Sequence, residues 1–164
     1  MKRRCVFLDR DGVINVKAAP HEYIVQWDDF QFLPNITDWI RLFNVLGFLV
    51  IVVTNQRCIA RGMATLEQLD TLHRRMVEHL SNLGARIDDI FLCPHEEGTC
   101  ACRKPQPGLV LQAVAKWNID LPSSLLIGDS PSDAELAMRC GLPYASAANG
   151  KIVGVRYLPP ERTA

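Results

Sequence analysis

The sequence predicts an α/β fold, a Rossmann-like parallel sheet flanked by helices, and three observations lead to this prediction. Short apolar runs rich in β-branched and aromatic residues, such as 48–53, are typical of strands buried on both faces. Stretches with apolar residues at helical spacing separate these runs. Polar residues follow the runs, as they do where open parallel sheets bind ligands. Strands that alternate with helices in this way are expected to form right-handed βαβ units.

The composition is that of an ordinary globular protein, with 48% hydrophobic and 22% charged residues, and 164 residues fit one domain over 1–164. The formal net charge is +0, so no overall field favours nucleic acid or an acidic membrane surface. The longest apolar stretch, 45–53, is too short to span a membrane, and no secretory signal precedes Asp9. We therefore expect a cytoplasmic monomer that binds neither nucleic acid nor membrane.

The first expected strand is the apolar run 6–8, which ends in Asp-Arg-Asp-Gly at 9–12. Asp9 and Asp11 are two residues apart at this strand end and can both face one small volume. Like charges held so close are costly unless a cation or a shared proton relieves them. The pair therefore indicates a Mg²⁺ site or acid/base chemistry, and the alternative is a solvated, Asp-rich turn.

The remaining elements follow in order along the chain. A long loop to Leu33 is expected to lie over the strand ends. Four further strands are expected at 48–53, 87–92, 125–127 and, weakly, near Tyr144. Four helices are expected between them: from Ile36 to a stop at Gly47, from the capping box Thr65-x-x-Gln68 to Gly84, from Pro107 to Trp117, and from a Ser132-x-x-Glu135 cap to Gly141. The tail over 150–164 is expected to be poorly ordered.

Four potential metal ligands lie within one short segment: Cys93, His95, Cys100 and Cys102. Three thiols and an imidazole suit tetrahedral Zn²⁺ with no open position, which is typical of a structural site. The alternative is a set of reactive thiols beside a chance histidine. A structural zinc would stiffen a loop too short for its own core and would hold Arg103 and Lys104, which follow it directly.

Chemistry-bearing residues follow four of the expected strands: Asp9 and Asp11, Thr54 and Asn55, Lys104, and Asp129 and Asp133. Each of these residues alone has a purely structural explanation: Thr54 could end a strand, Lys104 could be a surface lysine, and the aspartates at 129 and 133 could be favoured at a helix N-terminus. In this order they resemble the haloacid dehalogenase (HAD) superfamily of phosphohydrolases, whose motifs are Asp-x-Asp-Gly, a strand-end Thr or Ser, a Lys, and Gly-Asp-x-x-x-Asp. The resemblance covers 6–140.

This resemblance implies hydrolysis of phosphomonoesters through an aspartyl-phosphate on Asp9, with Asp11 as general acid and base. It implies that Asp9, the backbone carbonyl of Asp11, and Asp129 hold Mg²⁺. Thr54 would donate a hydrogen bond to the phosphate and Lys104 would offset its charge. Asp133 would orient Lys104 or a metal-bound water.

Further segments narrow the resemblance: Cys-Pro-His at 93–95, Cys-x-Cys-Arg-Lys-Pro at 100–105, and Thr-Asn-Gln at 54–56 followed by Ile-Ala-Arg-Gly at 59–62. They are similar to a small, capless group that contains phosphatases for heptose 1,7-bisphosphate and for histidinol phosphate. The stretch 59–62 resembles the heptose branch more, which removes the 7-phosphate in bacterial lipopolysaccharide or glycoprotein sugar synthesis.

By this narrower resemblance Arg103 would recognise substrate, and the loop 17–23, with Tyr23, would shape the pocket. Asn55, Gln56 and Ser130 are also expected to face the substrate, a small phosphorylated sugar or metabolite. Histidinol phosphate is the alternative substrate, and a phosphate-binding scaffold is the alternative outside enzymes.

Three features depart from the group's pattern. The tail after Gly141 lacks a clear closing strand, and the other two are single residues. Cys58 stands where a glycine is usual, and Ser130 stands where a basic residue is usual. The departure at Ser130 removes one positive charge from the expected substrate face.

Overall fold

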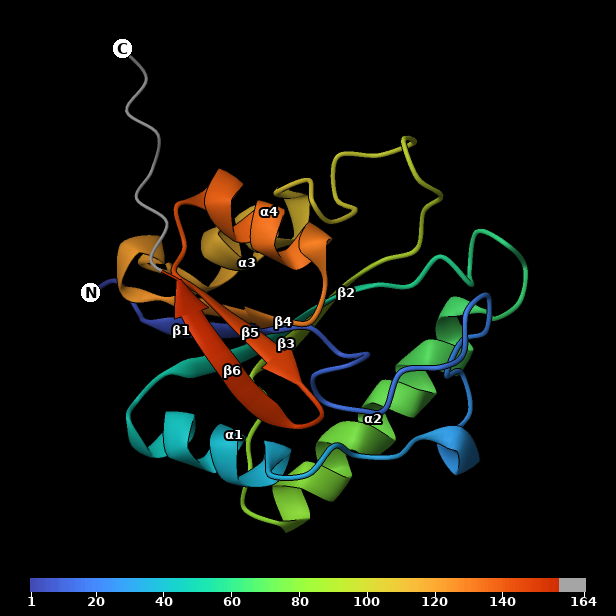
Figure 1. The fold of residues 1–164 in the computed structure, drawn as a ribbon, viewed down its shortest axis with the longest axis horizontal. Helices are drawn as coiled ribbons and strands as arrows, with labels where there is room; N and C mark the ends of the chain where they lie inside the picture. The colour runs from blue at the N-terminus through green and yellow to red at the C-terminus, as the bar shows by residue number, and fades with distance from the viewer. Residues whose placement is uncertain (157–164) are drawn as a thin grey trace.

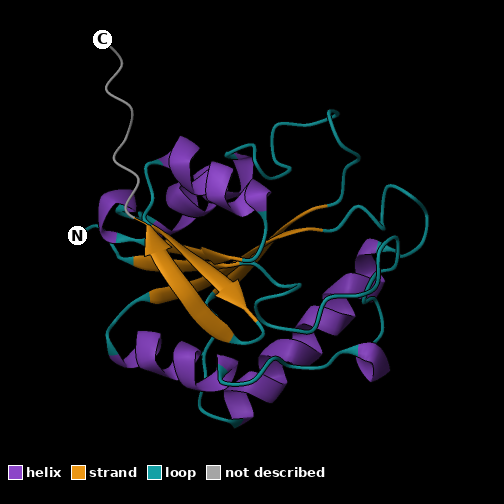
Figure 2. Cartoon of the chain, viewed as in Figure 1, coloured by secondary structure: helices purple, strands orange, loops and turns teal. Residues whose placement is uncertain are grey.

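The computed structural model describes residues 1–156, which form a six-stranded sheet with helices on both faces (Figures 1 and 2). The strand order is β3-β2-β1-β4-β5-β6. The first five strands in this order run parallel, and β6 is antiparallel to β5. The strands are β1 (Cys5–Leu8), β2 (Leu49–Asn55), β3 (Asp89–Cys93), β4 (Leu125–Gly128), β5 (Tyr144–Ala148) and β6 (Lys151–Arg156).

The α-helices divide between the two faces of the sheet: α1 (Ile36–Val45) and α2 (Leu66–Asn82) cover one, and α3 (Gly108–Trp117) and α4 (Pro131–Cys140) cover the other (Figure 1). Two 3-10 turns, Trp27–Asp29 and Leu121–Ser123, lie in the connecting segments. Over residues 1–156 no helix combines the length and apolar character needed to cross a membrane.

The alternation of side chains along β1 explains the two covered faces. Val6 and Leu8 pack into the core beneath α1 and α2, whereas Cys5 and Phe7 pack into the core beneath α3 and α4. All four are buried, because successive side chains of a strand point to opposite faces. Burying a side chain such as Leu8 contributes roughly 1.5–3 kcal/mol, so both helix layers are held by the apolar strands that the sequence predicts.

The strand order places a topological switch point at β1. The chain moves outward from β1 to β2 and β3 and then crosses back to β4 on the other side. Open parallel sheets bind ligands in the crevice outside the carboxyl ends of the strands at such a point. Asp9 follows β1 here, and its backbone N–H donates to the carbonyl of Ile127 on β4 at 3.1 Å.

The predicted strands and helices up to β5 are confirmed with small shifts, except at the start of α4. The Thr65 and Gln68 capping box opens α2 as expected. The prediction that Ser132 caps α4 is wrong, because Ser130 is the N-cap. Pro131 fits the first helical position, where no N–H is needed, and the Asp133 carboxylate accepts from the Ser130 backbone N–H at 3.2 Å.

The end of the sheet contains the largest difference from the prediction. The weak fifth strand forms as β5, and residues 151–156, expected to be poorly ordered, pair with it as β6. The turn between them is Asn149-Gly150, and both residues have positive φ. Asn-Gly is a strong sequence indicator of a tight hairpin. The rest of the expected tail, 157–164, lies outside the described residues.

Candidate active site

The polar residues that follow the strands meet at one end of the sheet, as the sequence predicts. The loops after β1, β2 and β3 leave the sheet at this end (Figure 1), and they contribute to a cavity of about 620 Å³. The loop 17–23, expected to shape a pocket, lines it too. Its lining includes seven residues predicted for the site: Asp9, Asp11, Tyr23, Asn55, Arg103, Lys104 and Ser130.

Lys104 is a buried cation at the base of this cavity, with a side chain 2% exposed. Its Nζ lies 2.8 Å from Asp9 Oδ1 and 2.7 Å from Asp133 Oδ1. Burial lowers the pKa of a lysine, but here the two carboxylates outweigh burial and raise the pKa of Lys104. Lys104 therefore stays charged and joins the loop after β3 to the end of β1 and to α4.

Asp9 is the buried carboxylate that faces Lys104. Burial raises the pKa of Asp9 to about 7; Lys104 opposes this shift, while Asp133 and Asp11 add to it. The backbone N–H of Arg10 also donates to Asp9 Oδ1 at 2.7 Å. A further positive charge beside Asp9 would favour its ionised form.

Asp11 has a different environment, although it is only two residues away. Its Oδ1 accepts from Arg10 Nη2 and Asn15 Nδ2, both at 2.9 Å, and its Oδ2 accepts from Gln56 Nε2 at 2.9 Å. Burial alone would raise the pKa of Asp11, but the Arg10 charge and these hydrogen bonds lower it. Three side chains thus fix the Asp11 carboxylate.

Asp129 meets the requirements of a cation ligand. Its Oδ2 accepts from Lys17 Nζ at 2.7 Å, and its Oδ1 is buried without a hydrogen-bond partner among the described residues. A Cβ on Gly12, whose φ is +89°, would lie 2.2 Å from Asp129 Oδ2, so only glycine allows this approach. Carboxylate oxygens of Asp9, Asp129 and Asp133 lie within 4.8 Å of one another. This oxygen-rich set fits Mg²⁺.

The Thr-Asn-Gln segment at the end of β2 supports its neighbours. Thr54 is 1% exposed, and its Oγ1 accepts from Gln56 Nε2 at 2.9 Å, which leaves its own proton to donate. Asn55 lines the cavity, but its amide holds the Lys104 backbone through two hydrogen bonds, of 3.0 and 3.1 Å. Gln56 was expected to face substrate; instead it is 1% exposed and lies against Asp11.

The other predicted substrate residues lie on separate loops around the cavity. Arg103 Nη1 is buried and has no hydrogen-bond partner within residues 1–156. Tyr23 Oη accepts from Arg57 Nε at 3.4 Å. The Ser130 hydroxyl donates to Asp133 Oδ2 at 2.6 Å, so the side chain is engaged with α4. Arg103 thus keeps a buried guanidinium donor without an acceptor among the described residues.

The Cys-His cluster forms as predicted in the loop after β3. The Cys93 Sγ lies 3.5 Å from Cys100 Sγ and 3.1 Å from Cys102 Sγ, and His95 Nδ1 lies 3.2 Å from Cys102 Sγ. Tetrahedral zinc with Zn–S bonds of about 2.3 Å separates its sulfurs by about 3.8 Å. All four ligand atoms lie within 4.8 Å of one another, so the cluster can hold zinc.

The structure adds residues that the sequence prediction missed. Arg10 is fully buried, binds Asp11, donates to the Ile24 carbonyl at 2.9 Å and contacts His73 Nε2 on α2 at 3.1 Å. Burial and the Arg10 charge lower the pKa of His73 to about 4, so the imidazole is a neutral acceptor. The position of Arg10 between two aspartates at the end of a buried strand could have predicted this ion pair. No sequence pattern pointed to the role of His73.

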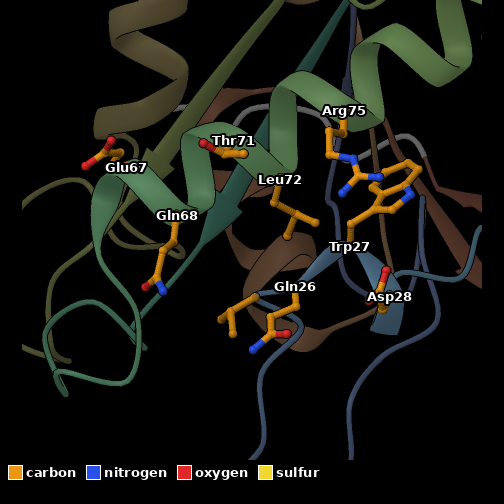
Figure 3. Close-up of a pocket in the computed structure, with 9 residues that line it drawn as sticks. Gln26, Trp27, Asp28, Glu67, Gln68, Thr71, Leu72 and Arg75 are labelled. Atoms are coloured by element: carbon orange, nitrogen blue, oxygen red, sulfur yellow. The ribbon is translucent and has the colours of Figure 1, made fainter.

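A second cavity, of about 400 Å³, lies between the segment 25–28 and α2 (Figure 3). Arg75 stacks over the Trp27 ring there, 4.9 Å from its centroid. None of the strand-end carboxylates or Lys104 lines this cavity. It is therefore separate from the site at the switch point.

The fold and this site define a class: a Rossmann-like hydrolase of the HAD type. Residues 101–153 match the family model described as HAD-hydrolase-like. The D-glycero-beta-D-manno-heptose-1,7-bisphosphate 7-phosphatase of Rhodopseudomonas palustris is 41% identical over 150 residues, covering 87% of this chain and 82% of that protein. The enzyme of the same name from Escherichia coli K12 is 39% identical over 141 residues, covering 81% and 72%.

A solved structure agrees with these relatives. The D,D-heptose 1,7-bisphosphate phosphatase from B. bronchiseptica, complexed with magnesium and phosphate, aligns with a TM-score of 0.83 and 30% identity over 96% of this chain and 90% of that one. The chain belongs to the family of these HAD-like phosphatases. It is a phosphatase, and the acidic set at the switch point fits the magnesium that this neighbour contains.

Proposed function

We propose that this enzyme removes the 7-phosphate of D-glycero-D-manno-heptose 1,7-bisphosphate through an aspartyl-phosphate on Asp9. The observation that carries the proposal is the buried Lys104 bound to both Asp9 and Asp133 at the base of one cavity. The names of the relatives support the substrate. We further propose that residues 1–164 form one domain and that the enzyme acts in the cytoplasm as a monomer.

In the first step an Asp9 carboxylate oxygen would attack phosphorus, and the bond from phosphorus to the sugar oxygen would break. Lys104, 2.8 Å from Asp9, would offset the charge on the transferred group. Thr54 would donate its free hydroxyl proton to a phosphate oxygen. Asp9, the Asp11 carbonyl and Asp129 would hold Mg²⁺, which supplies further positive charge there when bound.

Asp11 would move the protons in both steps. It would give a proton to the leaving sugar oxygen, and then take one from the water that attacks the phosphoenzyme and releases phosphate from Asp9. Its lowered pKa suits the second role. The negative charge of an arriving phosphate would raise the pKa of Asp11 and so favour the first role.

The test compares wild type, Asp9→Asn and Asp11→Asn on heptose 1,7-bisphosphate, histidinol phosphate and an aryl phosphate. We expect wild type to have its highest kcat/KM on the bisphosphate and to lose activity with a magnesium chelator. Asp9→Asn should show essentially no turnover. Asp11→Asn should lose about 10²- to 10⁴-fold on the sugar phosphate and less on the aryl phosphate, whose leaving group needs no proton.

Two results would contradict the proposal. Equal or higher efficiency on histidinol phosphate would assign the alternative substrate. A phosphate trapped by rapid quench and mapped to Asp11 instead of Asp9 would reverse the two roles.

A further inference from the structure

The rim of the cavity carries a cation outside the chemistry at its base. Three cations near these carboxylates are paired with them: Lys104 with Asp9 and Asp133, Lys17 with Asp129, and Arg10 with Asp11. Arg57 lines the same cavity but contacts none of these carboxylates. It lies two residues beyond the end of β2, and its side chain is 26% exposed.

Glu96 lies in the loop 94–102, which carries the Cys-His cluster and is called the zinc loop below, and it holds Arg57 in place. Arg57 Nη1 donates to Glu96 Oε1 at 3.0 Å, and Arg57 Nε donates to Tyr23 Oη at 3.4 Å. Arg61 Nε donates to the other Glu96 oxygen at 3.2 Å. One carboxylate therefore serves two guanidinium groups, so this cluster retains an excess positive charge. Neither Arg57 contact uses Nη2.

The position of Arg57 suits a second phosphate. Lys104 is buried at the base of the cavity. Arg57 also lines the cavity, and its guanidinium contacts Glu96, which does not line it. A substrate with phosphates at both ends that places one of them at Asp9 directs the other outward, toward the rim. On the side of Ser130, Lys17 is already paired with Asp129 at 2.7 Å, and the Ser130 hydroxyl donates to Asp133.

We infer that Arg57 binds the distal phosphate of a sugar bisphosphate and thereby selects bisphosphates over monophosphates. This inference rests on the proposed function. Arg57 would pair with the phosphate through its planar fork while Glu96 and Tyr23 hold the guanidinium in orientation. Arg103, with its uncommitted Nη1, lies on the same cavity and would share the recognition.

The experiment measures phosphate release from heptose 1,7-bisphosphate and from the same sugar carrying only the 7-phosphate. Its readout is the ratio of the two kcat/KM values in wild type, Arg57→Ser and Arg61→Ser. Arg61 is the matched control, because it shares Glu96 with Arg57 but does not line the cavity. Each variant removes one of the two arginines that pair with Glu96, so any damage to the zinc loop would appear in both variants.

We expect wild type to favour the bisphosphate and Arg57→Ser to lower the ratio by about tenfold to a hundredfold, mainly through KM, as for a lost hydrogen bond to a charged group. Arg61→Ser should keep the wild-type ratio. If wild type prefers the bisphosphate and both variants keep that preference, the inference is overturned while the proposed function stands. If wild type itself lacks the preference, both fail.

Discussion

Arg10 and His73 are the residues on which the difference between the two active-site aspartates depends. Asp9 faces Lys104, whereas Asp11 is fixed by Arg10, whose Nη1 needs an acceptor in a fully buried position. His73 supplies this acceptor only while it is neutral. A buried donor left without a partner costs about 1–3 kcal/mol, so His73 supports the Asp11 geometry from α2.

This pair gives the stability of the protein a pH dependence. The pKa of His73 is lowered to about 4 in the folded protein, so the unfolded chain binds more protons between that value and its ordinary pKa of about 6.5. The free energy of unfolding should therefore fall as pH drops from 6.5 toward 4, by up to about 3 kcal/mol from this group.

We predict that His73→Gln, which keeps an acceptor without a titrating ring, flattens this part of the pH dependence. Urea unfolding of wild type and variant at pH 7, 6, 5 and 4 measures it. His73→Ala should flatten it too, but should also lower stability at pH 7 by about 1–3 kcal/mol. Parallel pH curves for wild type and His73→Gln would refute the prediction.

The zinc loop is the element with the least core of its own. Its segment between Cys93 and Cys102 contains no helix or strand, yet it directly precedes Arg103 and Lys104. The loop packs against α3 so closely that a Cβ on Gly108 would lie 2.4 Å from the Ala101 carbonyl oxygen. A metal bound by the four side chains of the cluster would add stiffness to this loop.

We predict about one zinc per chain by elemental analysis, and a large loss of zinc in Cys100→Ser. Cys140→Ser is the matched control, because Cys140 is a free cysteine outside the cluster and should leave the zinc content intact. Zinc-depleted enzyme should lose activity that added magnesium does not restore, with faster proteolysis between 93 and 102. Full activity without zinc would contradict this role.

Local patterns predicted most elements, and the differences have local physical causes. The N-cap of α4 is Ser130 instead of Ser132, because the Asp133 carboxylate accepts from the Ser130 N–H and so favours the earlier of two plausible caps. The sequence prediction missed strand β6 because Gly154 interrupts its short apolar run; Val153 and Val155 remain 62% and 69% exposed. The Asn149-Gly150 turn was its available indicator.

For the whole molecule, the parallel sheet made the site predictable, because residues after parallel strands converge whatever their distance in sequence. The approach of Asp9, Lys104 and Asp129 follows from that topology. The partners of the individual side chains do not follow from it. Gln56 and Asn55 both come after β2, but one lies against Asp11 and the other holds the Lys104 backbone. Such contacts depend on loop geometry, which apolar periodicity does not encode.

Lys104 also joins parts of the molecule that are far apart in the chain. It links the loop after β3 to the end of β1 through Asp9 and to α4 through Asp133, and all three side chains are almost fully buried. Removing one partner from a buried ion pair typically costs about 3–5 kcal/mol, because the remaining charges lose their compensation.

We predict that Lys104→Met lowers the free energy of unfolding at pH 7 by about 3–5 kcal/mol, in addition to abolishing turnover. Without the ammonium, the folded-state pKa of Asp9 would lie further above its unfolded value. The folded state would then bind more protons than the unfolded state, so the loss relative to wild type should shrink as pH falls from 7 to 5.

Adding Asp133→Asn to Lys104→Met should recover part of the stability at pH 7, because it removes one of the two uncompensated charges. Urea unfolding of wild type, both single variants and the double variant at the two pH values measures these effects. A loss that is equal at pH 7 and 5 and unchanged by Asp133→Asn would mean that Lys104 stabilises the fold by packing and not by its charge.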